Sequence, residues 1–225
     1  MRDRTHTLSI ALAALAGLTL LAPHSVRAEA TMQEPSTEVR FPVVREAGGL
    51  RFRCLGTGLR RVFFFKVYAN TFCLDESKAD AILEAARKAY GQGKTGEDLA
   101  DTLEESDAYF AKLASSDSDK LVVMHMVRNV GRKKLVNAFR EALEDILPKA
   151  SIERLMGAIR TDAKDGQEVL FFTRGTKVTI QIGPETVEIE DPAVAKKIWT
   201  VWLGPDSVTP ALREDIARRQ AGAAE

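Results

Sequence analysis

The chain has 225 residues, 45% of them hydrophobic, so it is long enough to bury a substantial core. Its 32 basic and 32 acidic residues leave no net charge at neutral pH, which excludes a global field that would attract nucleic acid or anionic lipid. We therefore expect a globular domain with no nucleic-acid partner.

The first 28 residues have the organisation of a secretory signal peptide. Arg2 and Arg4 precede an apolar run over 8–22, and the Val-Arg-Ala of 26–28 supplies a small-residue cleavage site. The run is too short, and too soon followed by a proline, for a membrane span, although an uncleaved anchor is the alternative. We expect cleavage after Ala28, export to the periplasm and no stable membrane span after cleavage. The mature chain is then slightly acidic, because three basic residues and one acidic residue leave with the leader.

Strands dominate the first part of the mature chain. Residues 29–40 are polar and without periodicity, which predicts a flexible linker with order beginning near Phe41. Short strands are expected over 41–44 and 50–55. The glycines of Gly56-x-Gly58 then predict a tight turn into a long strand over 62–74, completing an antiparallel meander.

Alternation along the extended segment over 60–74 divides its side chains into two rows. The apolar row is Phe63, Phe65, Val67, Ala69, Thr71 and Cys73, and the row with polar groups is Arg60, Val62, Phe64, Lys66, Tyr68, Asn70, Phe72 and Leu74. An arginine at the rim of an apolar pocket can hold a carboxylate or enolate through two parallel hydrogen bonds, and a phenol adds a further donor. Arg60 and Tyr68 could thus hold a small amphipathic acid, although for an arbitrary strand a surface arginine beside a core tyrosine is the commoner arrangement.

The period changes to that of helices from Ser77 onward. Expected helices run from Ser77 to Gly91, from Thr95 through Leu113, from Gly131 to Pro148, from Ser151 to Ala163, from Asp191-Pro192 to Gly204-Pro205, and from Thr209-Pro210 to about Arg219. A strand over 121–127 and a hairpin of 169–173 with 178–182 separate them. This order predicts an α+β domain over 41–219, with helices layered on one face of an antiparallel sheet, and a disordered tail over 220–225.

The two cysteines could form a disulfide in an exported protein. Cys54 lies on the run entering the glycine turn and Cys73 near the far end of the run leaving it, so a simple hairpin would hold them far apart. We expect two buried free thiols, with a disulfide as the alternative.

Metal and cofactor chemistry find no support in the sequence. After cleavage His125 is the only histidine, and it lies inside an apolar strand, so we expect a structural role and no metal site. Gly56-x-Gly58 lacks the third glycine of a dinucleotide fingerprint, and Gly93-Lys94-Thr95 lacks the earlier glycine of a phosphate loop. We expect no cofactor.

Three ordered motifs resemble the chalcone isomerase-like family over roughly 41–219. They are Gly56-x-Gly58-x-Arg60 with Phe65-Lys66-Val67-Tyr68 and Phe72-x-Leu74; Val127-Arg128-Asn129-Val130 leading to Asn137-Ala138-Phe139; and Ile198 to Gly204 followed by Val208, Pro210 and Leu212. The resemblance implies an open-faced β-sandwich and an exported, bacterial branch related to plant chalcone isomerases and fatty-acid-binding proteins. It also implies that Arg60 is the ligand-holding arginine and that Tyr68 takes the position of the tyrosine of the fatty-acid-binding branch.

Departures from the isomerase pattern concern the polar groups that bind a phenolic substrate. Asn137 matches the family's asparagine, whereas Val130 replaces its second tyrosine and Val201 the threonine of the penultimate helix. Valine can neither donate a hydrogen bond nor relay a proton, so chalcone cyclisation is not expected.

The function predicted from these observations is binding of a small amphipathic carboxylate, such as a fatty acid, between sheet and helices. The expected ligand-binding residues are Arg60, Phe64, Tyr68, Asn137, Val201 and Trp202, with Val62, Phe72 and the helix from Trp199 to Leu203 as further tail contacts. One alternative is an intramolecular lyase acting on an enone, in which Arg60 would stabilise the oxyanion. Another is a structural or partner-binding module of the cell envelope.

Overall fold

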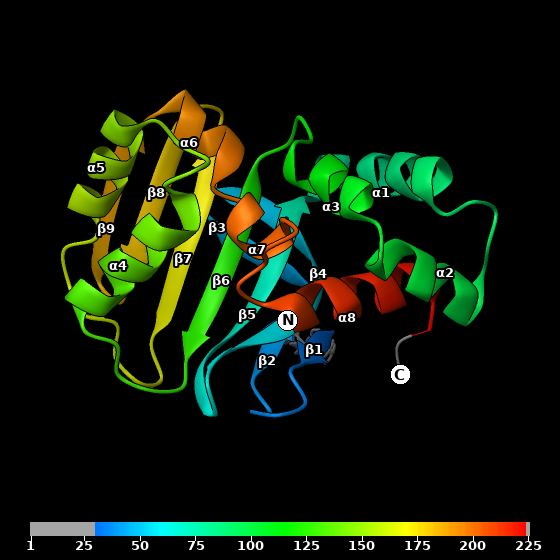
Figure 1. Ribbon diagram of the computed structural model, residues 1–225, viewed down its shortest axis with the longest axis horizontal. Coiled ribbons are helices and arrows are strands. Elements are labelled where there is room, and N and C mark those ends of the chain that lie inside the picture. The colour runs from blue at the N-terminus through cyan, green and yellow to red at the C-terminus, as the bar shows by residue number, and fades with distance from the viewer. Residues whose placement is uncertain (1–29, 224–225) are drawn as a thin grey trace, which may run out of the picture.

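The computed structural model describes residues 30–223, so the expected signal peptide lies outside the described residues. Seven antiparallel strands form one sheet in the order β3-β4-β5-β6-β7-β8-β9, and β1 and β2 pair in a small second sheet (Figure 1). The strands are β1 (Thr31–Gln33), β2 (Arg40–Pro42), β3 (Val44–Ala47), β4 (Leu50–Val62), β5 (Phe65–Asp75), β6 (Lys120–Met126), β7 (Glu168–Arg174), β8 (Lys177–Ile182) and β9 (Glu185–Glu190). The helices are α1 (Glu76–Tyr90), α2 (Gly96–Glu104), α3 (Asp107–Ala114), α4 (Arg132–Leu143), α5 (Lys149–Ala158), α6 (Pro192–Lys197), α7 (Thr200–Leu203) and α8 (Pro210–Ala221).

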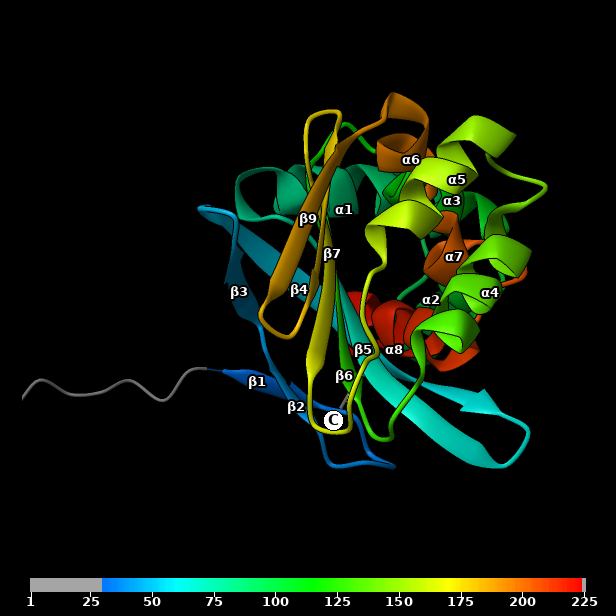
Figure 2. The ribbon, with the colours of Figure 1, turned by 90° about the vertical axis from the view of Figure 1, so that its left-hand side faces the viewer.

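The helices cover one face of the large sheet, as the α+β prediction requires (Figure 2). Alternation along β5 explains the arrangement, because Tyr68 and Phe72 belong to the large core under the helices. Ala69 and Cys73, on the other face, belong to a smaller core that β1 and β2 help to cover. The predicted open-faced sandwich is therefore confirmed.

The expected long strand over 62–74 is confirmed only from Phe65 onward, where β5 begins, because the chain reverses near its start. Phe63 and Phe64 form a two-residue turn, with Val62 opposite Phe65 and Arg60 opposite Tyr68. Phe63 has a left-handed backbone conformation, with φ of 54°. Aromatic residues are unusual in such a turn, for which glycine and asparagine are the common choices, so the composition of the segment concealed it.

The two glycines expected to form the turn lie inside β4 and pack against α8. A Cβ atom at Gly58 would lie 2.7 Å from the backbone nitrogen of Leu212, and one at Gly56 would lie 2.8 Å from that of Ile216. Glycine is required at both positions because the backbone of α8 lies directly on the strand.

Cys54 and Cys73 form a disulfide, so the expectation of free thiols is wrong. The reason is the true position of the turn. Because β4 continues to Val62, the register places Cys54 directly opposite Cys73 on neighbouring strands.

Several element boundaries also differ from those expected. The segment expected to be a flexible linker contains β1, whose Met32 is buried in the smaller core. The helix expected from Thr95 through Leu113 is two helices, because Ser106 caps a new one by accepting from the Tyr109 amide at 3.1 Å. The helix expected from Asp191 to Gly204 is divided into α6 and α7, and β9 was not anticipated. The last helix continues through Ala221 into the expected tail, and residues 224–225 lie outside the described part.

Candidate functional site

Arg60 and Tyr68 lie opposite each other on β4 and β5, on the face of the sheet that the helices cover. The sequence placed them on one face, and the structure does the same through hairpin pairing. Arg60 is half-buried, and its Nη1 donates a 2.8 Å hydrogen bond to the carbonyl oxygen of Val208, in the connection between α7 and α8. A ligand carboxylate would therefore compete with a backbone carbonyl for this guanidinium.

The Tyr68 hydroxyl is buried among polar groups from the C-terminal part of the chain. Burial raises the pKa of Tyr68, an effect opposed by the neighbouring Trp202 and Thr209 side chains and by the positive charge of Arg60. Tyr68 therefore remains a neutral phenol at physiological pH. It can donate one hydrogen bond to an acid bound beside Arg60.

Buried polar atoms without a hydrogen-bond partner lie on the same side of the sheet as this phenol. Within residues 30–223, the side-chain amide of Asn70, the indole N–H of Trp202 and the hydroxyl of Thr209 are buried and complete no hydrogen bond of normal geometry. Asn70 follows Tyr68 by two residues on β5 and therefore shares its face. A buried polar group without a partner costs about 1–3 kcal/mol, so several unpaired groups beside Arg60 are suited to a polar ligand or ordered water.

A surface groove of about 510 Å³ reaches Arg60 from outside. The connection between β1 and β2, strand β4 and helix α8 form its walls, and Arg60 and Val208 both line it. Neither Tyr68 nor Trp202 lines the groove. The contact between Arg60 and Val208 thus lies where the groove meets the buried polar cluster, and ligand access to Tyr68 requires this contact to open.

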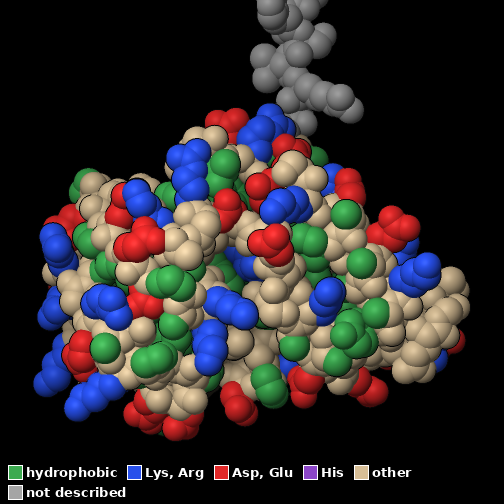
Figure 3. Space-filling view, turned by 90° about the horizontal axis from the view of Figure 1, so that it is seen from above, with side chains coloured by type: hydrophobic (Ala, Val, Ile, Leu, Met, Phe, Trp, Pro, Cys, Tyr) green, Lys and Arg blue, Asp and Glu red, His purple; other side chains and the backbone are tan. Residues whose placement is uncertain are grey.

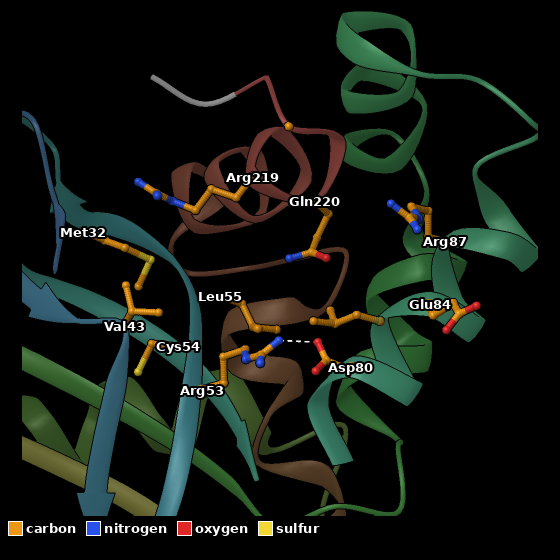
Figure 4. Close-up of a pocket in the computed structure, with 12 residues that line it drawn as sticks. Met32, Val43, Arg53, Cys54, Leu55, Asp80, Glu84, Arg87, Arg219 and Gln220 are labelled. Atoms are coloured by element: carbon orange, nitrogen blue, oxygen red, sulfur yellow. Dashed lines mark hydrogen bonds and ion pairs between the residues drawn. The ribbon is translucent and has the colours of Figure 1, made fainter. Parts of the chain in front are cut away.

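A second cavity of about 620 Å³ lies between β4, α1 and the end of α8 (Figure 4). Its lining includes Arg53, Arg87 and Arg219. Two of these arginines are already neutralised, since Arg53 pairs with Asp80 and Arg219 pairs with Asp215 at 2.8 Å. None of the binding residues expected from the sequence lines this cavity, so it is the weaker candidate for the ligand site.

The remaining expected site residues do not all gather at Arg60. Phe64 is 79% exposed at the turn between β4 and β5, and Val62 is 42% exposed beside it, so neither contacts a buried ligand tail. Asn137 is exposed on α4, whose buried side carries Leu135 and Phe139 instead.

Val201 and Trp202 are buried in α7 and belong to the large core. Trp202 packs edge-on against Phe139 at 5.9 Å, and Phe72 packs edge-on against Trp199 at 6.1 Å, between ring centroids. These contacts fill the core between sheet and helices with aromatic rings.

Sequence reasoning missed two members of the polar cluster. Asn70 was visible in the same row as Tyr68, and an amide among apolar residues was the signal. Thr209 was interpreted only as the start of a helix, yet its side chain makes no cap hydrogen bond and is buried beside Tyr68.

Two kinds of site find no candidate in the described part of the chain. Between residues 30 and 223, no group of three or more His, Cys, Asp or Glu side chains is placed to hold a metal ion. Over the same residues, no helix has the length and apolar character needed to cross a bilayer.

An antiparallel sheet with helices on one face, and with an arginine and a tyrosine opposite each other on neighbouring strands beneath them, defines an open-faced α+β sandwich. The chain belongs to the chalcone isomerase-like family, whose sequence profile matches residues 102–216. That match begins after β5, so it covers α7 and Trp202 but neither Arg60 nor Tyr68.

A solved structure extends the likeness to the whole domain. The fatty-acid binding protein AtFAP1 of Arabidopsis thaliana is similar in fold, with a TM-score of 0.65 and 17% sequence identity, over 86% of this chain and 98% of that protein. No curated protein matches the chain in sequence. At this identity the likeness to the Arabidopsis protein shows the common fold.

Proposed function

We propose that the protein binds a small amphipathic carboxylate, such as a fatty acid, with its head group at Arg60 and Tyr68. The observation that carries the proposal is the buried polar cluster beside Arg60, in which Asn70, Trp202 and Thr209 have unpaired atoms. A carboxylate at this place would accept from the guanidinium, the phenol and the indole N–H together. The fold shared with a fatty-acid binding protein supports the same class of ligand.

The apolar surroundings suit the hydrocarbon part of such a ligand. Val201 and Trp202 border the cluster from α7, and Phe72 lies on the same sheet face as Tyr68. The tail would have to displace or separate side chains that now pack together, so binding includes opening of the connection between α7 and α8.

We also propose that the protein is exported and does not cyclise chalcones. The disulfide between Cys54 and Cys73 supports an oxidising compartment, since such bonds persist outside the cytosol. Val130 and Val201 supply no polar atom for a phenolic substrate, which supports the absence of cyclisation.

The test compares palmitate binding by wild type, Arg60→Ala and Tyr68→Phe, with thermal unfolding measured in parallel. Deleting one partner of a partly desolvated charge pair is expected to weaken binding by about 2–5 kcal/mol. Tyr68→Phe removes one neutral hydrogen bond, worth about 0.5–1.5 kcal/mol, and keeps the ring packing. Arg174→Ala, on the exposed end of β7, is the matched control and should bind like wild type.

Two outcomes would refute this function. If Arg60→Ala binds palmitate as tightly as wild type, the arginine does not hold the head group. Saturable turnover of a chalcone that Arg60→Ala abolishes would instead establish the intramolecular lyase.

A further inference from the structure

The turn between β4 and β5 carries a concentrated apolar surface. Over residues 30–223, the exposed large apolar side chains are the four consecutive ones at this turn, Val62 (42% exposed), Phe63 (90%), Phe64 (79%) and Phe65 (46%). We call these four residues the aromatic tip. The hairpin that carries it extends beyond the helices and the remainder of the sheet (Figure 2). Exposed apolar side chains that gather in this way mark an interaction site.

The aromatic tip is not needed to build the turn. A two-residue hairpin turn forms most easily with glycine or asparagine, whereas here Phe63 adopts a φ of 54°. The rings of Phe64 and Phe65 contact each other at 4.2 Å between centroids, and neither residue is a buried member of either hydrophobic core. Their side chains thus contribute little to the fold and are available to a partner.

Three basic side chains, Arg61, Lys66 and Arg128, surround the aromatic tip, and we call them the basic collar. The guanidinium of Arg128 lies 4.6 Å from the ring centroid of Phe65. Arg61 and Lys66 bond to the neutral hydroxyl and carbonyl oxygens of Ser36. The nearby Glu34 carboxylate accepts hydrogen bonds from the backbone amides of Ser36 and Thr37 and from the Thr37 hydroxyl.

The opposite end of the molecule carries side chains of both charges. Figure 3 views that end, where acidic and basic side chains are interspersed over the surface. Because the basic and acidic residues of the chain balance, attraction to an anionic surface depends on a local concentration of positive charge, and the basic collar provides one.

We propose that the aromatic tip inserts into the interface of an anionic lipid bilayer, with the basic collar contacting lipid phosphates. A narrow convex tip is poorly suited to a stable protein interface, which buries about 800 Å² on each partner. Aromatic rings are favoured at the depth of the head groups, and clustered lysine and arginine side chains are attracted to anionic lipid.

This interaction extends the proposed function without depending on it. Arg61 belongs to the basic collar and also lines the groove that leads to Arg60. Docking by the tip would hold that groove beside the bilayer, from which an amphipathic acid is available.

The experiment measures sedimentation of the mature protein with vesicles of phosphatidylglycerol and phosphatidylethanolamine, and with vesicles of phosphatidylcholine alone. One variant combines Phe63→Ser with Phe64→Ser. A second combines Arg61→Gln, Lys66→Gln and Arg128→Gln. The control removes the same charge from exposed positions elsewhere, through Lys133→Gln, Lys149→Gln and Arg174→Gln.

We expect wild type and the control to sediment with the anionic vesicles. The tip variant should bind them at least tenfold more weakly, and the collar variant should lose the preference for anionic over neutral vesicles. All variants should keep the thermal midpoint of wild type, because the substituted residues are exposed or partly exposed. In vesicle-free solution the tip variant should bind palmitate like wild type, which separates a failure of this proposal from a failure of the proposed function.

The proposal is overturned if wild type does not sediment with anionic vesicles, or if the tip variant sediments as wild type does. It is equally overturned if wild type self-associates in solution through the aromatic tip, so that the serine variant is monomeric while wild type is not. In that case a second copy of the chain is the partner.

Discussion

Replacing Gly58 with alanine tests how closely α8 lies on β4. The new Cβ would stand 2.7 Å from the nitrogen and 2.8 Å from the Cα of Leu212, both in the backbone of α8. Carbon atoms pack favourably at about 3.5–4.0 Å, so the helix must move by roughly 1 Å. No rotation of a side chain relieves the clash.

Movement of α8 disturbs a buried interface, which sets the size of the effect. Leu212, Ile216 and Ala217 of α8 are fully buried. Overpacking typically costs about 1–3 kcal/mol, and we expect the upper end, about 3 kcal/mol, because the neighbour is backbone. Palmitate affinity should fall as well, since α8 begins directly after the connection that Arg60 contacts.

Urea unfolding of Gly58→Ala, Gly157→Ala and wild type gives the required comparison. A Cβ at Gly157 meets nothing within 4 Å, so this substitution in α5 should stabilise the protein by about 0.5–1 kcal/mol. If Gly58→Ala unfolds within about 0.5 kcal/mol of wild type, the close approach of helix and strand is incorrect.

Two further predictions concern the disulfide and a buried lysine. Replacing Cys54 and Cys73 together by alanine should lower the free energy of unfolding by about 3 kcal/mol, because the bond closes a loop with a sequence separation of 19; unchanged urea unfolding would exclude a stabilising bond. Burial lowers the pKa of Lys120 to about 8, although its ammonium donates to the carbonyls of Ser116 and Ser118 at 2.6 and 2.8 Å. The unfolded chain then binds this proton more tightly than the folded protein does. The buried charge therefore lowers the free energy of unfolding by its full amount below about pH 8. Stability should increase by roughly 2 kcal/mol from about pH 7 to about pH 9.5, and a Lys120→Met variant that keeps the same rise would assign it to another group.

The fold could be predicted where local signals decide the structure. The Asp191 carboxylate caps α6 at the amides of Ala193 and Val194, as Asp-Pro predicted. Gly91 ends α1, and Pro210 begins α8. In each case the deciding interaction lies within a few residues along the chain.

Errors arose where contacts distant in sequence decide the structure. Gly56 and Gly58 resemble turn residues until α8 is placed over them, and two phenylalanines resemble strand residues until their exposure is known. Placing the turn wrongly then separated two cysteines that are in fact paired. Arg60 and Tyr68 were placed on one face correctly although the turn was missed, because a register shift between Arg60 and Arg61 brings Arg60 opposite Tyr68 across the hairpin.

One strand was missed although its local signal was present. Over 185–190, Val187 and Ile189 alternate with glutamates and pack against the large core, while the acidic residues face outward. Acidic side chains on an edge strand also discourage pairing with another chain.

The order of the strands has a consequence for how the chain completes its fold. Every strand of the large sheet pairs with its neighbour in sequence, so the sheet can grow in step with synthesis from the N-terminus. α8 is different, because it returns to β4 across most of the domain and accepts the Thr57 amide at Asp215, 158 residues away. If folding follows the order of synthesis, the glycine surface of β4 remains uncovered, and the connection that holds Arg60 remains unanchored, until the C-terminal helix reaches its place.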